Sequence, residues 1–144
     1  MSETVIKCES VYKIFGENAK KMLEEANGNV DAKTFQDKGC IVGVNNASFE
    51  VKKGEMLVVM GLSGSGKSTL LRCISRLTDA TGGKIFIEGQ DLLELNNKEL
   101  IDLRRNKMGM VFQSFALLPH KTVVENIAFP LQIKGTNTQD SISR

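Results

Sequence analysis

Residues 55–77 read EMLVVMGLSGSGKSTLLRCISRL and decide the fold. The near-continuous apolar run at 55–60 is typical of a buried strand in a parallel sheet. Residues 68–77 place four aliphatic side chains on one face of a helix and put Arg72 and Arg76 on the other face. A glycine-rich loop separates the two segments. The sequence therefore predicts a strand, a tight loop and an amphipathic helix in direct succession.

The loop matches the pattern G-x-x-x-x-G-K-[ST], which cradles nucleotide phosphates when it stands between a strand and a helix. Its glycines permit positive φ and let backbone N–H groups approach phosphate oxygens. Lys67 offers an ammonium to the β- and γ-phosphates, Ser68 offers a hydroxyl to Mg²⁺, and the helix adds its positive dipole end. A glycine-rich turn that binds nothing is much the weaker interpretation. The predicted nucleotide-binding residues are Gly61, Leu62, Ser63, Gly64, Ser65, Gly66, Lys67, Ser68 and Thr69.

The segments before the loop predict an antiparallel, β-rich part. Short β-prone pieces lie at 5–7 and 11–15, and two more, at 41–44 and 47–51, flank an expected Asn45-Asn46 turn. Residues 16–40 interrupt this pattern with a helix predicted at 17–26 and a second polar stretch, and the simplest interpretation is a solvated helical insertion.

The segments after the loop predict alternating strands and helices. A strand is expected at 84–89, and Asn96 with Glu99 resembles a capping box that opens a helix ending near Arg105. An apolar strand at 108–112 and a short helix at 123–128 follow. This order favours an α/β fold with parallel pairing, preceded by the antiparallel part.

Composition limits the classes of function. The chain has 144 residues, 41% of them hydrophobic, and a net charge of +2, which fits one globular domain at most. Its apolar runs are far shorter than the roughly 18 residues of a membrane span, and residues 1–13 lack the apolar region of a secretion signal, so we expect neither. Neither half carries a basic arm, so nucleic acid is not an expected partner. Cys8, Cys40 and Cys73 lie too far apart for a disulfide framework or a zinc site, and we expect reduced, cytosolic thiols.

Residues downstream of the loop separate the kinds of nucleotide-binding protein. A GTPase would show N-K-x-D, but residues 106–109 lack the aspartate. A small kinase would show an arginine-rich lid, whereas Arg104 and Arg105 lie on a predicted helix where a solvated face is the simpler interpretation. Gln113 follows the strand at 108–112 and could reach Mg²⁺ or an attacking water, because ligands collect at the carboxyl edge of a parallel sheet. An ordinary polar loop residue fits Gln113 equally well.

These motifs together resemble the ATP-binding subunit of an ABC transporter. The insertion at 16–40 and the stretch 113–129 narrow the resemblance to the glycine betaine/L-proline (quaternary amine) importers. The implied fold class is α/β, a P-loop NTPase of the ABC ATPase type with a parallel sheet core and an N-terminal antiparallel β part. Residues 1–135 would form the N-terminal part of that domain, and residues 136–144 a polar, disordered tail.

The resemblance also implies roles for single residues. Residues 61–69 would be the Walker A motif, and Gln113 the Q-loop residue that positions water and shares Mg²⁺ with Ser68. Phe15 falls where the family's adenine-stacking aromatic lies, a contact worth about 0.5–1.5 kcal/mol, although an ordinary core phenylalanine fits as well. Residues 114–122 would contact the permease. His120, the only histidine, is then expected to be a loop or interface residue.

The implied protein couples ATP hydrolysis to uptake of glycine betaine/proline-type osmoprotectants at the cytoplasmic face of the membrane. Its partners are a permease, a second ATPase subunit and, indirectly, a substrate-binding protein. The family's Walker B, signature and switch histidine follow the Q-loop, so we expect that the chain ends early, binds ATP weakly and does not hydrolyse it alone. A non-catalytic remnant or nucleotide-binding module is the alternative, and a soluble P-loop kinase is a third possibility.

Overall fold

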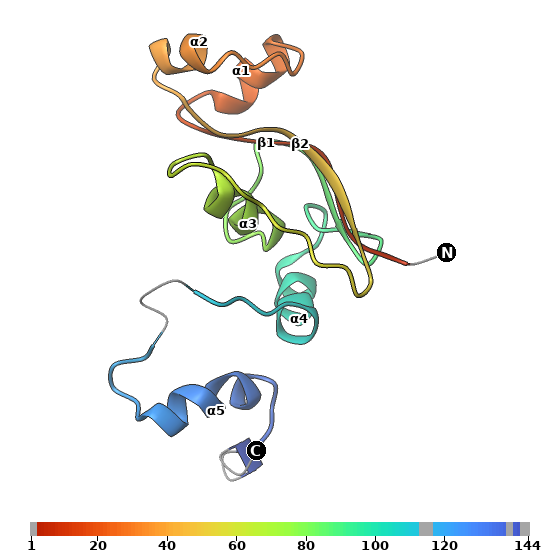
Figure 1. Cartoon of the computed structure of the whole chain (residues 1–144), viewed down its shortest axis with the longest axis vertical. Helices are drawn as coiled ribbons and strands as arrows, with labels where there is room; N and C mark the ends of the chain where they lie inside the picture. The colour runs from red at the N-terminus through yellow and green to blue at the C-terminus, as the bar shows by residue number, and fades with distance from the viewer. Residues whose placement is uncertain (1–2, 113–116, 138–139, 142–144) are drawn as a thin grey trace. The chain divides into compact units, whose positions relative to one another are not determined.

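The computed structural model describes residues 3–112, 117–137 and 140–141. The chain divides into two compact units, Met1–Leu95 and Asn96–Arg144. Figure 1 shows the elements in chain order. They are β1 (Thr4–Phe15), α1 (Ala19–Glu25), α2 (Ala32–Asp37), β2 (Ile41–Lys52), α3 (Lys67–Ile74), β3 (Gly82–Ile87), β4 (Gln90–Asp91), α4 (Asn97–Lys107) and α5 (Val123–Ile133).

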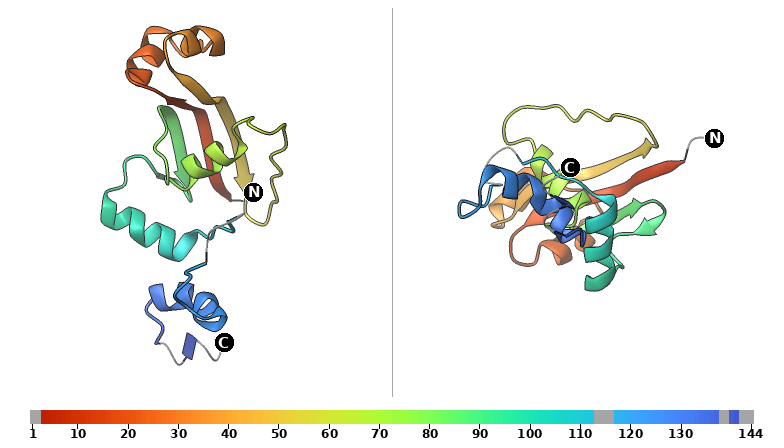
Figure 2. Two further views of the ribbon diagram at one scale, coloured as in Figure 1. Left: turned by 90° about the vertical axis from the view of Figure 1, so that its left-hand side faces the viewer. Right: turned by 90° about the horizontal axis from the view of Figure 1, so that it is seen from below.

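The first unit is built on an antiparallel sheet with the strand order β2-β1-β3-β4. Figure 2 shows the long strands β1 and β2 side by side, with β3 on the other side of β1. The antiparallel part predicted from the sequence is therefore confirmed. The expected Asn45-Asn46 turn is wrong, because β2 runs through both residues, and Asn46 with its φ of 51° sits at an irregularity of the strand. The turn propensity of the Asn-Asn pair is therefore outweighed by the pairing of β2 with β1 on both sides of it.

The insertion between β1 and β2 holds two helices. The helix predicted at 17–26 is confirmed as α1. Asp31 is the N-cap of α2, and its side chain accepts from the Thr34 N–H at 2.8 Å. The insertion is less solvated than expected. Its own small core combines strand and helix residues, namely Tyr12, Ile14, Ala19, Leu23, Phe35 and Cys40.

Two strands predicted from apolar runs do not form. Residues 55–60 have no strand structure, and Met56 and Met60 are 86% and 85% exposed. Residues 108–112 are likewise irregular, and Val111 is fully exposed. The physical reason is that a strand is stable only when a neighbour satisfies its N–H and C=O groups, and no described strand pairs with either run. The parallel pairing predicted from the sequence is therefore not formed within the described residues, where every strand pair is antiparallel.

The second unit contains α4 and α5. The predicted capping box is present: the Asn96 side chain accepts from the Glu99 N–H, and the Glu99 carboxylate accepts from the Asn96 N–H. A second capping box, Thr122 with Glu125, opens α5, which runs further than the predicted 123–128 and contains Pro130. Within the described part of the chain, no helix has the length and apolarity needed to cross a bilayer.

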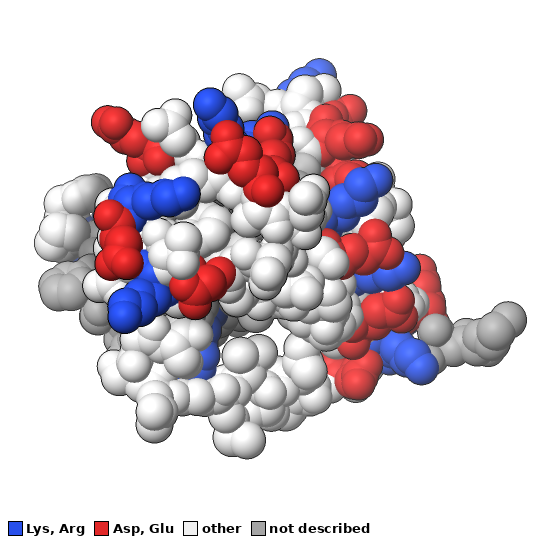
Figure 3. All heavy atoms as spheres, turned by 90° about the horizontal axis from the view of Figure 1, so that it is seen from above, with Lys and Arg blue, Asp and Glu red and all other residues white. Residues whose placement is uncertain are grey.

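Charged side chains of both signs are interspersed on the face drawn in Figure 3. On the sheet, Lys7 of β1 pairs with Glu9 at 2.7 Å and with Glu50 of β2 at 3.5 Å. The two carboxylates raise the pKa of Lys7, with the Glu9 hydrogen bond as the largest cause. Exposed pairs of this kind add little stability, so the sheet depends mainly on its backbone ladder and buried side chains.

Candidate nucleotide-binding site

The glycine-rich loop ends at Gly66, which caps α3 with a φ of 89°. A left-handed N-cap suits glycine, since a Cβ would be strained at this φ. A Cβ on Gly66 would also overlap the carbonyl oxygen of Gly43 in β2. Gly66 therefore serves two purposes: it turns the loop into the helix and lets the loop lie directly against β2.

Helix α3 follows with its apolar side buried. Leu70 and Cys73 are buried, whereas Leu71 is 52% exposed. Gly66 has no side chain that could accept hydrogen bonds from the first-turn N–H groups, so these donors and the positive dipole end are directed at the loop. This arrangement suits an anionic ligand such as phosphate.

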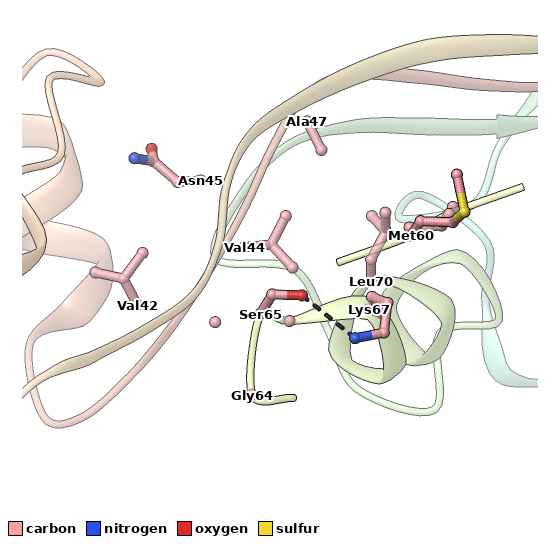
Figure 4. A pocket seen from close by; sticks show the side chains of 12 residues that line it. Val42, Val44, Asn45, Ala47, Met60, Gly64, Ser65, Lys67 and Leu70 are labelled. Atoms are coloured by element: carbon pink, nitrogen blue, oxygen red, sulfur yellow. Dashed lines mark hydrogen bonds between the residues drawn. The ribbon is translucent and has the colours of Figure 1, made fainter. Parts of the chain in front are cut away.

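Lys67 folds its side chain back over the loop. Its ammonium donates to the carbonyl oxygens of Gly61 at 2.9 Å and Leu62 at 2.7 Å, and contacts the Ser65 hydroxyl at 3.4 Å (Figure 4). The loop thus holds a cation at its centre without an acidic side chain. The acceptors are neutral oxygens, so an anionic phosphate would be a stronger partner for the ammonium.

A pocket of about 390 Å³ lies between the loop and β2. Figure 4 shows Val44, Asn45 and Ala47 coming from the strand, and Ser65 and Lys67 from the loop and helix. The lining residues are Val42, Gly43, Val44, Asn45, Ala47, Val59, Met60, Gly64, Ser65, Gly66, Lys67 and Leu70. The pocket therefore has a mostly apolar wall on the strand side and polar groups on the loop side.

Phe15 stands at the end of β1, beside this pocket. It is 43% exposed, so its interpretation as an ordinary core phenylalanine is wrong. A Cβ built on Gly43 would meet the Phe15 ring at 2.9 Å and the Thr69 methyl at 3.1 Å. Phe15, Gly43 and Thr69 are thus brought together although they lie far apart in the sequence.

The remaining residues predicted for the site are either exposed or outside the described residues. Gln113 and residues 114–116 lie outside the described residues. His120 is exposed, and Ser68 lies in the first turn of α3 with an exposed side chain.

Arg76, expected on the exposed face of the helix, instead lies beyond the end of α3 with a φ of 51° and donates to the carbonyl oxygens of Leu92 and Leu95. These two hydrogen bonds hold the Arg76 side chain inward, where it is 19% exposed.

The strand side of the pocket contains residues that were not predicted from the sequence. Gly43 allows the loop, Phe15 and Thr69 to approach β2, and Asn45 lines the pocket while its amide donates to the Val30 carbonyl oxygen of the insertion at 3.3 Å. A signal for Gly43 was available, since a glycine inside a strand often marks a close backbone approach. Asn45 carried a misleading signal, because an Asn-Asn pair usually indicates a turn.

All three cysteines are free, buried thiols. Cys8 of β1 and Cys73 of α3 lie close enough to interact electrostatically. Burial, and secondarily the charge that Cys73 would carry, raise the pKa of the Cys8 thiol from 9.0 to about 11. Burial also raises the pKa of Cys73. These thiols are packing groups between the sheet and α3, with low nucleophilicity at neutral pH.

The pKa of Cys8 predicts how stability changes at high pH. The folded state holds the Cys8 proton up to about pH 11, whereas the unfolded chain releases it near pH 9. The contribution of Cys8 to the free energy of unfolding is therefore complete below pH 9 and falls as pH rises toward 11. Urea titrations at pH 8 to 11, followed by far-ultraviolet circular dichroism, test this. Cys8→Ala should reduce the pH dependence of the free energy of unfolding between pH 9 and 11, by an amount that corresponds to the release of up to one proton. An unchanged pH dependence would contradict the raised pKa of Cys8.

Comparison with known families decides among the kinds of nucleotide-binding protein. The ABC transporter family model matches residues 44–144, which include the loop, α3, α4 and α5. The chain belongs to the ABC transporter family. The sequence-based identification of the family is confirmed, and the alternative of a soluble kinase is set aside.

Among the curated relatives of the chain are ATP-binding proteins of two transport systems. It is 90% identical over all 144 residues to the trimethylamine N-oxide transport system ATP-binding protein TmoW of Pelagibacter ubique, and it spans 42% of that protein's length. It is 46% identical over 94% of its residues to the glycine betaine transport ATP-binding protein OpuAA of Bacillus subtilis, of which it spans 32%.

Solved structures of ATP-binding cassettes share the fold. The ATP-binding cassette MJ0796, in a dimeric post-hydrolysis state bound to ADP and Pi, aligns with a TM-score of 0.75 and 30% identity. The alignment covers 96% of this chain and 53% of MJ0796. The predicted fold class, a P-loop NTPase of the ABC ATPase type, is confirmed.

Proposed function

We propose that the chain is the N-terminal part of the ATP-binding subunit of an ABC importer, which couples ATP hydrolysis to the uptake of a small solute with a trimethylated nitrogen. The observation that carries the proposal is the 90% identity, over every residue of the chain, with a trimethylamine N-oxide transport ATP-binding protein. The loop geometry supports the ATP-binding half of the proposal, because it combines helix N–H donors with the Lys67 ammonium.

The proposed ligand is ATP with Mg²⁺. The site fits ATP with Mg²⁺, since the loop has no acidic side chain that would repel phosphate. Gly66 also lets the loop lie directly against β2, in a position that any residue with a Cβ could not occupy. Residues 61–69 would hold the phosphates, Ser68 with Gln113 would hold Mg²⁺, and Phe15 would stack on adenine. When bound, Mg²⁺ neutralises phosphate charge and orients the terminal phosphate. This chain's own contribution is to orient the nucleotide between its loop and β2.

The proposed partners are a second ATP-binding subunit and a permease. The solved cassette MJ0796 is dimeric, which supports the first. For the second, residues 114–122 are the proposed contact. Of the described part, Leu117 is 76% exposed and precedes α5, whose Val123 is 75% exposed. Such apolar exposure favours a contact with another protein surface. A substrate-binding protein would act indirectly, and the assembly would place this chain at the cytoplasmic face of the membrane.

The class of solute comes from the relatives, because an ATP-binding subunit does not contact the transported molecule. The relatives carry trimethylamine N-oxide and glycine betaine in their names, and both compounds have a trimethylated nitrogen. The proposal is therefore a solute with that group. It keeps glycine betaine from the glycine betaine/proline type predicted from the sequence, leaves out proline, which has no trimethylated nitrogen, and places trimethylamine N-oxide first.

Uptake of labelled solutes tests this proposal. Disruption of the gene that encodes this chain is expected to abolish uptake of labelled trimethylamine N-oxide at micromolar concentration, with a smaller or no effect on labelled glycine betaine. Reintroduction of the intact gene should restore uptake, whereas the same gene with Lys67→Ala should not. Unchanged uptake of both solutes after disruption would overturn the proposed class of solute.

A further inference from the structure

We infer that Lys13 is a positioning residue, which holds the Phe15 ring in place for stacking on the nucleotide base. The inference rests on the proposed function and deepens it. The Lys13 ammonium lies 4.9 Å from the centroid of the Phe15 ring, well within the range of a cation–π contact. Phe15 is 43% exposed and stands at the end of its strand, where a ring without such a partner would sample several rotamers.

The Lys13 side chain is itself fixed at its far end. Its ammonium donates a hydrogen bond of 2.9 Å to the carbonyl oxygen of Asp79, in the turn that follows α3. The same turn holds the backbone on both sides of Lys13. The Thr81 N–H donates to the Tyr12 carbonyl oxygen at 2.7 Å, and the Ile14 N–H donates to the Thr81 hydroxyl at 2.9 Å. Lys13 therefore presents a cation whose position is set by three hydrogen bonds.

The orientation of the ring follows from these contacts. The cation lies over one face of Phe15, and the Cε2 edge lies against Gly43, which lines the pocket of the nucleotide loop. The face directed away from Lys13 is the one that a planar base would cover. Because the ring is already held in this orientation before binding, binding does not have to order it, and the lower entropy cost favours affinity.

Binding of ATP and of inorganic tripolyphosphate can be compared, to distinguish an effect of Lys13 on base stacking from an effect on phosphate binding. ATP carries a base, whereas inorganic tripolyphosphate carries the phosphate chain alone. Calorimetric titration of the 144-residue chain should show that Lys13→Met weakens ATP binding by about 2- to 5-fold, the range for an exposed cation–π contact, and leaves tripolyphosphate binding unchanged. Lys13→Arg should bind ATP as the wild type does, because a guanidinium also interacts with an aromatic face.

Two further variants sharpen the test. Lys13→Gln can still donate a hydrogen bond but has no charge, so it should weaken ATP binding as Lys13→Met does. Lys21→Met removes the same charge from an exposed ion pair with Glu25 in the insertion and should change neither affinity. Urea titrations of each variant confirm that it is folded.

The outcomes separate the two proposals. If Lys13→Met changes neither affinity, or weakens ATP and tripolyphosphate alike, the role of Lys13 is overturned while ATP binding stands. If the wild-type chain binds neither ligand, or if Lys67→Ala binds both as the wild type does, the proposed nucleotide site fails, and the role of Lys13 fails with it.

Discussion

Replacing Lys67 with alanine is expected to weaken ATP binding by about 10- to 100-fold, since hydrogen bonds to charged groups contribute roughly 1.5–3 kcal/mol. The ammonium lies at the centre of the loop, 2.7–2.9 Å from the Leu62 and Gly61 carbonyl oxygens. A phosphate would replace these neutral acceptors with anionic oxygens, and alanine has no donor to offer. Equilibrium dialysis with labelled ATP over a millimolar concentration range measures the effect.

Lys53→Ala is the matched control for the loss of positive charge. Lys53 is exposed and pairs with Glu3 at 3.7 Å, outside the nucleotide pocket. Its replacement should leave ATP binding within about 2-fold of the wild type, because exposed pairs contribute little and salt screens distant charges. Equal weakening by both substitutions would show that ATP is held by overall charge and not by the loop.

The local part of the site was predictable from the sequence. The glycines, Lys67 and Ser68 lie within eight consecutive residues, and short-range rules link such a pattern to a loop that caps a helix. The capping box of Asn96 and Glu99 was predictable for the same reason, since its two hydrogen bonds join residues three apart. In both cases the chemistry that fixes the structure is contained within one or two turns of chain.

The non-local part was not predictable. The run at 55–60 has a strand's composition, but whether it forms a strand depends on neighbours that no local pattern reveals. Asn45 and Asn46 have the composition of a turn, yet pairing along β1 keeps them within β2. Phe15 could be assigned only through family resemblance, because its place beside the loop results from Gly43, a residue 28 positions further along the chain.

The pairing of Gly43 with Gly66 leads to the largest expected effect on folding. Gly66→Ala introduces a Cβ at a φ of 89° and directs it into the Gly43 carbonyl oxygen, so both the backbone angle and the packing oppose it. The left-handed angle alone costs about 1–2 kcal/mol, and the overlap with rigid backbone should bring the loss of unfolding free energy to about 3 kcal/mol or more. Urea titration monitored by Tyr12 fluorescence measures this loss.

Gly64→Ala separates the two causes within the same loop. Gly64 has a similar φ of 78°, but a Cβ there would meet nothing within 4 Å. Its replacement should therefore cost only the backbone penalty, about 1–2 kcal/mol. The two variants should also differ in ligand binding, because only Gly66→Ala pushes the start of α3 away from β2 and misplaces the Lys67 ammonium. Equal losses of stability in the two variants would mean that the loop does not rest on Gly43, and that the strand side of the pocket is not held as described.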